Sequence, residues 1–227
     1  VGQLLSMDAG ELLPPELAEI LSRLRADAIP MPMSQVVSAL HANWGEGWDR
    51  HFERFSFTPM AAASIGQVHF GQRKDGRKVA VKIQYPGIRR SIDSDVDNVA
   101  TLLRVSGLLP KSLDIKPLLD EAKKQLHDEA DYRREGACMM QFASLLADAD
   151  EFIVPEMHED LTTENILAMT RLDGDAVETL IHQPQAERDR IVSQLFRLLF
   201  REIFEFRLIQ TDPNFANYRY AAASQQL

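Results

Sequence analysis

Two short segments contain residues whose types and spacing are typical of phosphate chemistry. Residues 61–68 read AAASIGQV, and residues 79–82 read VAVK. In a nucleotide-binding hairpin, small residues let backbone N–H groups approach the phosphates, and a lysine on a following strand reaches their oxygens. Alanine stands here where glycine is usual, and it adopts positive φ less readily. Taken alone the spacing is weak evidence, because small residues before a strand are common and Lys82 also fits a lysine extended from a strand edge.

A second candidate lies near the end of the sequence, where residues 210–217 read QTDPNFAN. Asp212 and Asn217 have the D-x-x-x-x-N spacing of a kinase catalytic loop. That loop needs a carboxylate facing the attacking group and an amide oxygen on a metal beside the γ-phosphate. A plain proline turn would explain this segment by itself. The order and spacing of all three elements together favour one shared nucleotide site.

Acidic residues between these elements offer a partner for the lysine. Residues 129–135 read EADYRRE, in a helical pattern. A kinase needs one helical glutamate that pairs with its strand lysine, and both Glu129 and Glu135 qualify, on different faces of a helix. A solvated charged face is the ordinary explanation of such a run, and it applies to Asp131 as well.

The elements that must position these residues follow from the periodicity of apolar side chains. Period-two segments predict strands at 52–72, 77–85, 151–159 and 164–174, with a turn at 74–76. Helical periodicity predicts helices within 11–54 and at 88–109, 112–149 and 185–206. Strands that gather before a final long helix predict an α+β fold, in which a mixed lobe is joined to a helical one.

The composition is that of a folded protein with one large domain or two small lobes. Of 227 residues, 45% are hydrophobic and 26% are charged, and the net charge of −9 disfavours a nucleic-acid partner without opposing a nucleotide. The single cysteine, Cys138, excludes an intramolecular disulfide, fits a reducing compartment and is expected to be an inert packed or half-exposed thiol. No apolar run has the roughly 18 residues of a membrane span, and the start shows no signal-peptide pattern.

Together these motifs resemble the UbiB/AarF family of atypical kinases, most closely its subgroup required for ubiquinone biosynthesis. The resemblance spans nearly the whole chain. It is carried by Gly2, Gln3 and Ser6 (the end of a K-x-G-Q-x-x-S motif), the segments 61–69, 79–87 and 92–96, the E-x-D pair Glu129 and Asp131 with Tyr132 and Glu135, and QTDPNFAN. The last motif has the form Gln-Thr-Asp-Pro-Asn, which is similar to that of the family subgroup found in mitochondria and related bacteria.

The family implies a protein-kinase-like two-lobed fold. Its N-terminal helical extension would pack over the site that a protein substrate occupies in other kinases. On this sequence the resemblance places that extension at 1–54, a kinase-like N-lobe with inserted helices at 55–172, and the start of a truncated C-lobe with the catalytic loop at 173–227.

The resemblance also implies roles for single residues. Lys82 would bind the α- and β-phosphates of ATP and pair with Glu135, and Asp212 would be the catalytic carboxylate. Asn217 would hold Mg²⁺, with a second metal ligand expected beyond Leu227. The phosphate lid would consist of Ala61, Ala62, Ala63, Ser64, Gly66 and Val68. The acidic pair Glu129 and Asp131 would face the same cleft, and Gly2 and Gln3 would belong to the motif of the extension. A hinge that reads adenine would lie at 169–172.

Two classes of function remain open. One is an enzyme that uses Mg-ATP as an atypical kinase or ATPase and supports ubiquinone synthesis, as retention of Lys82, Asp212 and Asn217 favours. The other is a non-catalytic nucleotide switch or scaffold of a lipid-biosynthetic complex, which the missing glycines and the acidic pair favour. An isoprenoid-binding scaffold is a third option that the sequence neither supports nor excludes.

The resemblance further implies quinone-biosynthesis proteins and membrane lipids as partners, and no nucleic acid. We expect an intracellular protein, on the matrix side of the inner mitochondrial membrane in a eukaryote, or cytoplasmic and membrane-peripheral in a bacterium. The K-x-G-Q lysine and a D-F-G aspartate are absent from this sequence, so we expect the chain as given to be inactive or very weak.

Overall fold

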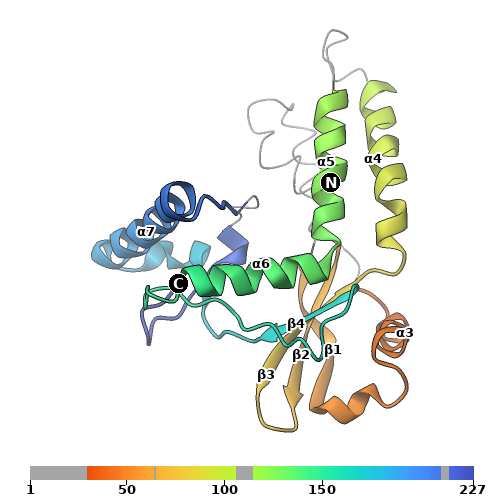
Figure 1. Cartoon of the computed structure of the whole chain (residues 1–227), viewed down its shortest axis with the longest axis horizontal. Coiled ribbons are helices and arrows are strands. Elements are labelled where there is room, and N and C mark those ends of the chain that lie inside the picture. Colours follow the sequence, from red (N-terminus) through yellow and green to blue (C-terminus); the bar gives the residue numbers. More distant parts are fainter. Residues whose placement is uncertain (1–29, 64, 106–114, 211–214) are drawn as a thin grey trace. The chain divides into compact units, whose positions relative to one another are not determined.

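The computed structural model forms two compact units (Figure 1). The first unit comprises the described residues up to Gly136 together with Met157–Met169. The second comprises Ala137–Glu156 and the described part of Thr170–Leu227. The residues that the structure describes are 30–63, 65–105, 115–210 and 215–227.

A four-stranded sheet with the order β1-β2-β3-β4 is the centre of the first unit. β1 and β2 pair antiparallel, and so do β2 and β3, the latter across the turn predicted at 74–76. The single strand predicted over 52–72 is wrong, because this segment forms two strands, β1 and β2, that pair with each other. Gly76, in the turn between β2 and β3, has a φ of 87°, which glycine adopts without strain. The strands are β1 (Phe52–Ala63), β2 (Gly66–Arg73), β3 (Lys78–Gln84) and β4 (Ile166–Thr170).

The two faces of β3 have different surroundings. Val79, Val81 and Ile83 are fully buried and belong to one hydrophobic cluster with Leu40 of α3 (Met33–Trp44). Because side chains alternate along a strand, Lys82 points to the opposite face. The other helical elements of this unit are the 3₁₀ turn η1 (Trp48–His51), α4 (Ile88–Val105), α5 (Lys116–Glu129) and the start of α6 (Tyr132–Leu145).

α4 and α5 lie side by side, and a 2.7 Å ion pair between Lys123 and Asp97 joins them (Figure 1). The single helix predicted over 112–149 is wrong at its middle, because α5 ends before Ala130 and α6 starts after Asp131. The Asp131 carboxylate accepts the backbone N–H of Arg134 at 3.1 Å. This is an N-cap bond that satisfies a free donor of α6 and so favours a new helix start here.

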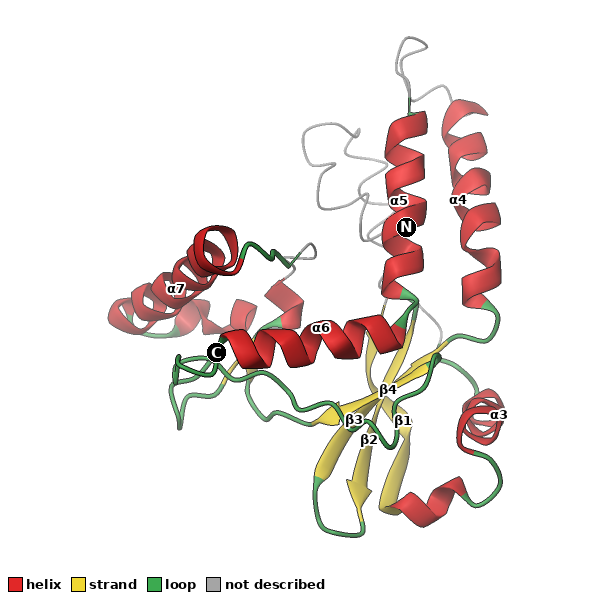
Figure 2. Ribbon diagram, in the orientation of Figure 1, coloured by secondary structure: helices red, strands yellow, loops and turns green. Residues whose placement is uncertain are grey.

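The second unit packs the long helix α7 against short elements around it (Figure 2). Its buried cluster includes Phe152, Leu180, Leu198, Tyr220 and Leu227. The elements are β5 (Asp175–Ala176), η2 (Val177–His182), α7 (Gln185–Phe200), the π-helical turn η3 (Arg201–Phe206), η4 (Phe215–Asn217) and β6 (Arg219–Tyr220), and β5 pairs with β6.

The strand predicted over 151–159 is wrong except for one β-bridge, between Met157 and Met169. The N–H group of Ile153 does not bond to a neighbouring strand of the sheet but donates to the carbonyl of Leu227 at 2.9 Å. Pro155 has no N–H to give to a ladder. The alternating pattern therefore describes an extended segment whose hydrogen bonds lead to two different neighbours.

The helix predicted over 185–206 changes its winding before its end. The turn after Phe200 is π-helical, and Arg207 closes it with a φ of 53°. Glu202 in this turn is 3% exposed, and its carboxylate accepts the N–H of Gln210 at 3.1 Å. Burial raises the pKa of Glu202. The wider turn thus holds the backbone of Gln210, two positions before Asp212 in the sequence.

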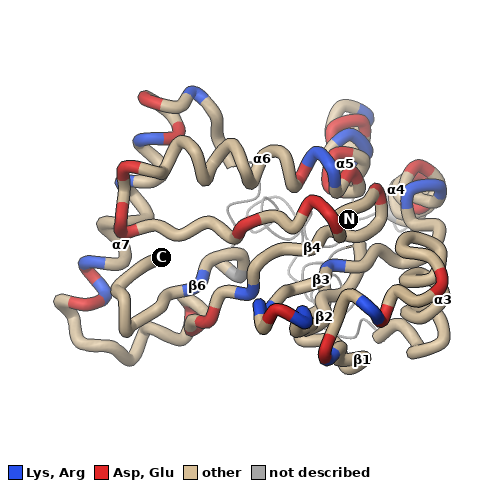
Figure 3. The backbone as a smooth tube through the Cα atoms, turned by 60° about the horizontal axis from the view of Figure 1, so that its bottom comes forward, with Lys and Arg blue, Asp and Glu red and all other residues tan. Residues whose placement is uncertain are grey.

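Charges of both signs are interspersed along the described backbone. In Figure 3 basic and acidic residues stand close together along α4, α5 and α7. Among the described residues, no helix combines the length and the apolar character that crossing a bilayer requires.

Candidate nucleotide site

Residues from three neighbouring strands line up on one face of the sheet. Ala61 of β1 lies opposite Val68 of β2, and Val68 lies opposite Lys82 of β3. Directly paired residues of antiparallel strands point to the same face. The lid positions Ala61 and Val68 therefore share a face with the Lys82 side chain.

The lid itself is the end of the β1–β2 hairpin. Ala61 and Ala62 are exposed, and Ala63, half-buried, lies opposite Gly66. Ser64 lies outside the described residues. That these positions contact phosphates stays a prediction.

Lys82 forms an ion pair with Glu135 of α6. Its ammonium lies 3.0 Å and 3.1 Å from the two carboxylate oxygens, and the side chains are 14% and 35% exposed. Of the two glutamates that the sequence left open as partners of Lys82, the structure pairs it with this one. A half-buried pair with two short contacts holds the ammonium more firmly than an exposed surface pair would.

A second contact fixes the corner of the chain beside this pair. Gln84 is buried, and its side-chain amide donates to the carbonyl of Ala130 at 2.6 Å. This bond ties the end of β3 to the break between α5 and α6. The start of α6, and Glu135 with it, is thereby anchored to the strand that carries Lys82.

The two acidic-motif residues occupy different local positions. Glu129 is half-buried at the end of α5, and Asp131 is the N-cap of α6. The carboxylate of Asp131 thus has a structural partner, and a role for either residue beside a nucleotide stays a prediction.

The predicted chemistry in the second unit is only partly described. Asn217 is exposed at the end of η4. Asp212, Gly2 and Gln3 lie outside the described residues. Among the described residues, no group of three or more His, Cys, Asp or Glu side chains could hold a metal ion. A magnesium site usually has few protein oxygen ligands besides substrate phosphates, and the amide oxygen of Asn217 is a ligand of the type that such a site uses.

The chain crosses from the first unit to the second inside the predicted hinge. Met169 is the last residue of one unit, and Thr170 is the first of the other. β4 ends at Thr170, and residues 171–174 form no regular element. That this segment binds adenine stays a prediction.

Sequence reasoning missed a buried polar network on the face of the sheet opposite Lys82. The amide of Gln67 donates to Nε2 of His69 at 2.8 Å, and Nδ1–H of His69 donates to the Ser56 carbonyl at 2.9 Å. The Gln67 amide oxygen accepts the Met31 N–H at 2.8 Å. Two polar residues at inward positions of a period-two strand were the available signal.

The network predicts a dependence of stability on pH. Burial lowers the pKa of His69, and the bond to Ser56 opposes this effect only in part. Below the unfolded pKa of about 6.5 the unfolded chain binds more protons, so stability falls as the pH decreases, by at most about 1.4 kcal/mol per pH unit. Urea unfolding at several pH values should show this slope, and His69→Asn should flatten it.

The exposed His182 provides the matched control. His182→Asn should leave the slope between about pH 5 and about pH 7 unchanged. An equal slope in the parent protein and in His69→Asn would show that His69 does not titrate on unfolding.

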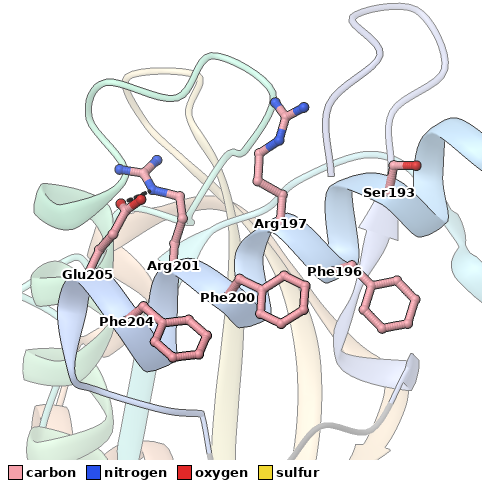
Figure 4. A pocket seen from close by; sticks show the side chains of 7 residues that line it. All are labelled: Ser193, Phe196, Arg197, Phe200, Arg201, Phe204 and Glu205. Carbon is pink, nitrogen blue, oxygen red and sulfur yellow. Dashed lines mark hydrogen bonds and ion pairs between the residues drawn. The ribbon is translucent and has the colours of Figure 1, made fainter.

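A surface groove in the second unit contains none of the predicted site residues. Its volume is about 560 Å³, and Phe196, Phe200 and Phe204 line one side of it (Figure 4). Arg197 and Arg201 extend from the same helix in another direction and pair with acidic side chains.

Comparison with known proteins decides the family. The ABC1 atypical kinase-like domain matches residues 23–227. This chain belongs to that family. The match confirms the resemblance drawn from the sequence, and the fold is kinase-like, with a β-sheet N-lobe and helices.

Curated relatives are similar over the whole chain. The mitochondrial atypical kinase COQ8 of Saccharomyces cerevisiae is 41% identical over 227 residues, which are 100% of this chain and 45% of the relative. The mitochondrial atypical kinase COQ8B of Rattus norvegicus is 43% identical over 100% of this chain and 43% of its own length. The chain thus spans less than half the length of these relatives.

A solved structure has the same fold. Rv3197 of Mycobacterium tuberculosis, determined in complex with erythromycin, matches with a TM-score of 0.72 and 31% identity. The match covers 99% of this chain and 57% of that protein.

Proposed function

We propose that this chain is the nucleotide-binding part of an atypical kinase or ATPase that binds Mg-ATP and supports ubiquinone (coenzyme Q) biosynthesis. The observation that carries the proposal is the Lys82–Glu135 ion pair, which lies beside a hairpin lid of small residues. The names of the COQ8 relatives support the atypical-kinase class. The link to ubiquinone is the one implied by the sequence motifs.

The pair gives Lys82 a defined task. Glu135 holds the ammonium on the sheet face that also carries Ala61 and Val68. An ammonium fixed in this way can make charge-assisted hydrogen bonds to the α- and β-phosphates while Glu135 keeps it in place. The exposed alanines of the lid leave room for the phosphates but offer fewer backbone conformations than glycines would.

The remaining roles come from the family motifs. Asp212 is proposed to accept the proton of the attacking hydroxyl or water, and Asn217 to hold Mg²⁺ with a second ligand beyond Leu227. When bound, the ion neutralises charge on the β- and γ-phosphates. Glu129 and Asp131 are proposed to face the nucleotide from the α5–α6 corner, and Gly2 and Gln3 from the N-terminal extension.

A second candidate function is a nucleotide-dependent switch or scaffold of a lipid-biosynthetic complex. Alanine in place of glycine in the lid favours it, because a less adaptable lid handles the γ-phosphate differently. Both candidates require ATP binding at Lys82, and only the enzyme requires turnover that depends on Asp212.

Partners and location are proposed from the sequence resemblance and, for location, also from the names of these relatives. Proteins of quinone synthesis and membrane lipids are the proposed partners besides the nucleotide. In a eukaryote we propose a mitochondrial location, which the names of the mitochondrial relatives support. The matrix side of the inner membrane, or in a bacterium the cytoplasm beside the membrane, is proposed from the sequence resemblance.

ATP binding by the complete protein tests the proposal. Lys82→Met keeps the length of the side chain and removes its charge, so the loss of charge-assisted hydrogen bonds should weaken ATP binding by at least about tenfold. Isothermal titration calorimetry measures the change. Lys124 is an exposed lysine of α5, and Lys124→Met should bind ATP as the parent does. Equal affinities in the two variants would reject Lys82 as a phosphate ligand.

A further inference from the structure

Lys82 has a second neighbour besides Glu135. Its ammonium lies over the ring of Tyr132, 5.0 Å from the ring centroid. Tyr132 is fully buried, and the Lys82 side chain is 14% exposed. An aromatic face attracts a cation through its quadrupole, and the attraction grows when water is kept away.

Both neighbours come from the first turn of one helix. Tyr132 is the first residue of α6, and Glu135 follows three positions later. Residues three apart lie on the same face of a helix. The N-cap bond of Asp131 and the Gln84–Ala130 bond hold this turn in place. One anchored helical turn therefore presents both a carboxylate and an aromatic face to the same ammonium.

We infer that Tyr132 is a positioning residue whose ring holds the Lys82 ammonium in its place for phosphate binding. The carboxylate of Glu135 is itself an anion, so an incoming polyphosphate competes with it for the ammonium. The neutral ring does not repel the phosphates and keeps its attraction for Lys82 when they arrive. This inference rests on the proposed function only in treating Lys82 as the phosphate-binding lysine.

The hydroxyl of Tyr132 provides a control within the same side chain. It is buried and has no hydrogen-bond partner among the described residues. A buried hydroxyl without a hydrogen-bond partner lowers stability. The hydroxyl therefore does not explain why this position has an aromatic side chain. Tyr132→Phe removes the hydroxyl and keeps the ring face toward Lys82.

The test changes the electrons of the ring and keeps its shape. In the complete protein, Tyr132 is replaced by phenylalanine and by phenylalanines with progressively more ring fluorines, which weaken the negative face. Trace acetic anhydride acetylates only neutral amines, and mass spectrometry gives the rate at Lys82 relative to the exposed Lys124. We expect Tyr132→Phe to match the parent and the Lys82 rate to rise with fluorination, by at least about threefold across the series.

Controls separate this role from a merely structural one. The trend in the Lys82 rate is measured only over variants whose thermal midpoint equals that of Tyr132→Phe. Tyr132→Leu provides an independent comparison, because Lys82 in this variant should be acetylated faster than in Tyr132→Phe. The inference would be overturned by an acetylation rate at Lys82 that does not depend on fluorination. It would also be overturned if the full increase in this rate were already present in Tyr132→Phe. Labelling is done without nucleotide, so a failure of the parent to bind ATP would reject the proposed function and leave this result unaffected.

Discussion

Replacing Asp212 by asparagine in the complete protein is expected to lower ATP turnover by at least about a hundredfold, because a positioned general base contributes that much and an amide cannot accept the proton. The two side chains have nearly the same shape, so the affinity for ATP should stay within about threefold of the parent value. Steady-state phosphate release and calorimetric binding measure the two quantities on the same preparation.

Gln210 provides a control two positions before Asp212. Its side-chain oxygen accepts the Tyr218 hydroxyl at 2.7 Å, and Gln210→Glu keeps that acceptor, so this variant should retain most of the turnover. Turnover of Asp212→Asn equal to that of the parent would remove Asp212 from the mechanism. Tight ATP binding with no turnover in the parent itself would favour the switch over the enzyme.

Gly66→Ala is expected to destabilise the first unit by about 3 kcal/mol, because overpacking against immobile atoms has costs of this size. A Cβ at this position would lie 2.2 Å from the carbonyl oxygen of Ile83 and 2.9 Å from its carbon. Both are backbone atoms of β3, so a change of rotamer cannot relieve the clash. β3 would have to shift, and Lys82 precedes Ile83 in that strand.

Ala62→Gly is the matched control in the same hairpin, because Ala62 is exposed and lies opposite Gln67. Its expected cost is only about 0.5–1 kcal/mol, from backbone entropy. Thermal or urea unfolding compares the two variants. Parent-like stability of Gly66→Ala combined with weaker ATP binding would show that Gly66 serves the nucleotide and not the packing of the strands.

Much of the site could be predicted because its signals are local. The β2–β3 pairing that places Val68 opposite Lys82 follows from two period-two segments joined by a short turn. The pairing of Ala61 with Val68 did not follow, because residues 52–72 read as one strand. The lysine on β3 and a glutamate on a following helix are recognisable by type and order. The periodicity could not choose between Glu129 and Glu135, because the choice depends on where one helix ends and the next begins.

The features that prediction missed depend on contacts between distant segments. The break before α6 is stabilised by a single side-chain cap at Asp131, in a run that otherwise reads as helix. At the π-helical turn the buried Glu202 accepts a hydrogen bond from Gln210, and helical periodicity does not encode this contact. Likewise, the Gln67–His69 network is satisfied by Ser56 of β1 and by Met31, which precedes α3.

The central claim is that the ammonium fixed by Glu135 binds the phosphates of ATP. A crystal structure of the complete protein with Mg²⁺ and a non-hydrolysable ATP analogue tests it most directly. We predict that Nζ of Lys82 lies about 3 Å from an α- or β-phosphate oxygen, with Glu135 still in contact with the ammonium. A nucleotide bound elsewhere, with the Lys82–Glu135 pair intact and apart from it, would contradict the account.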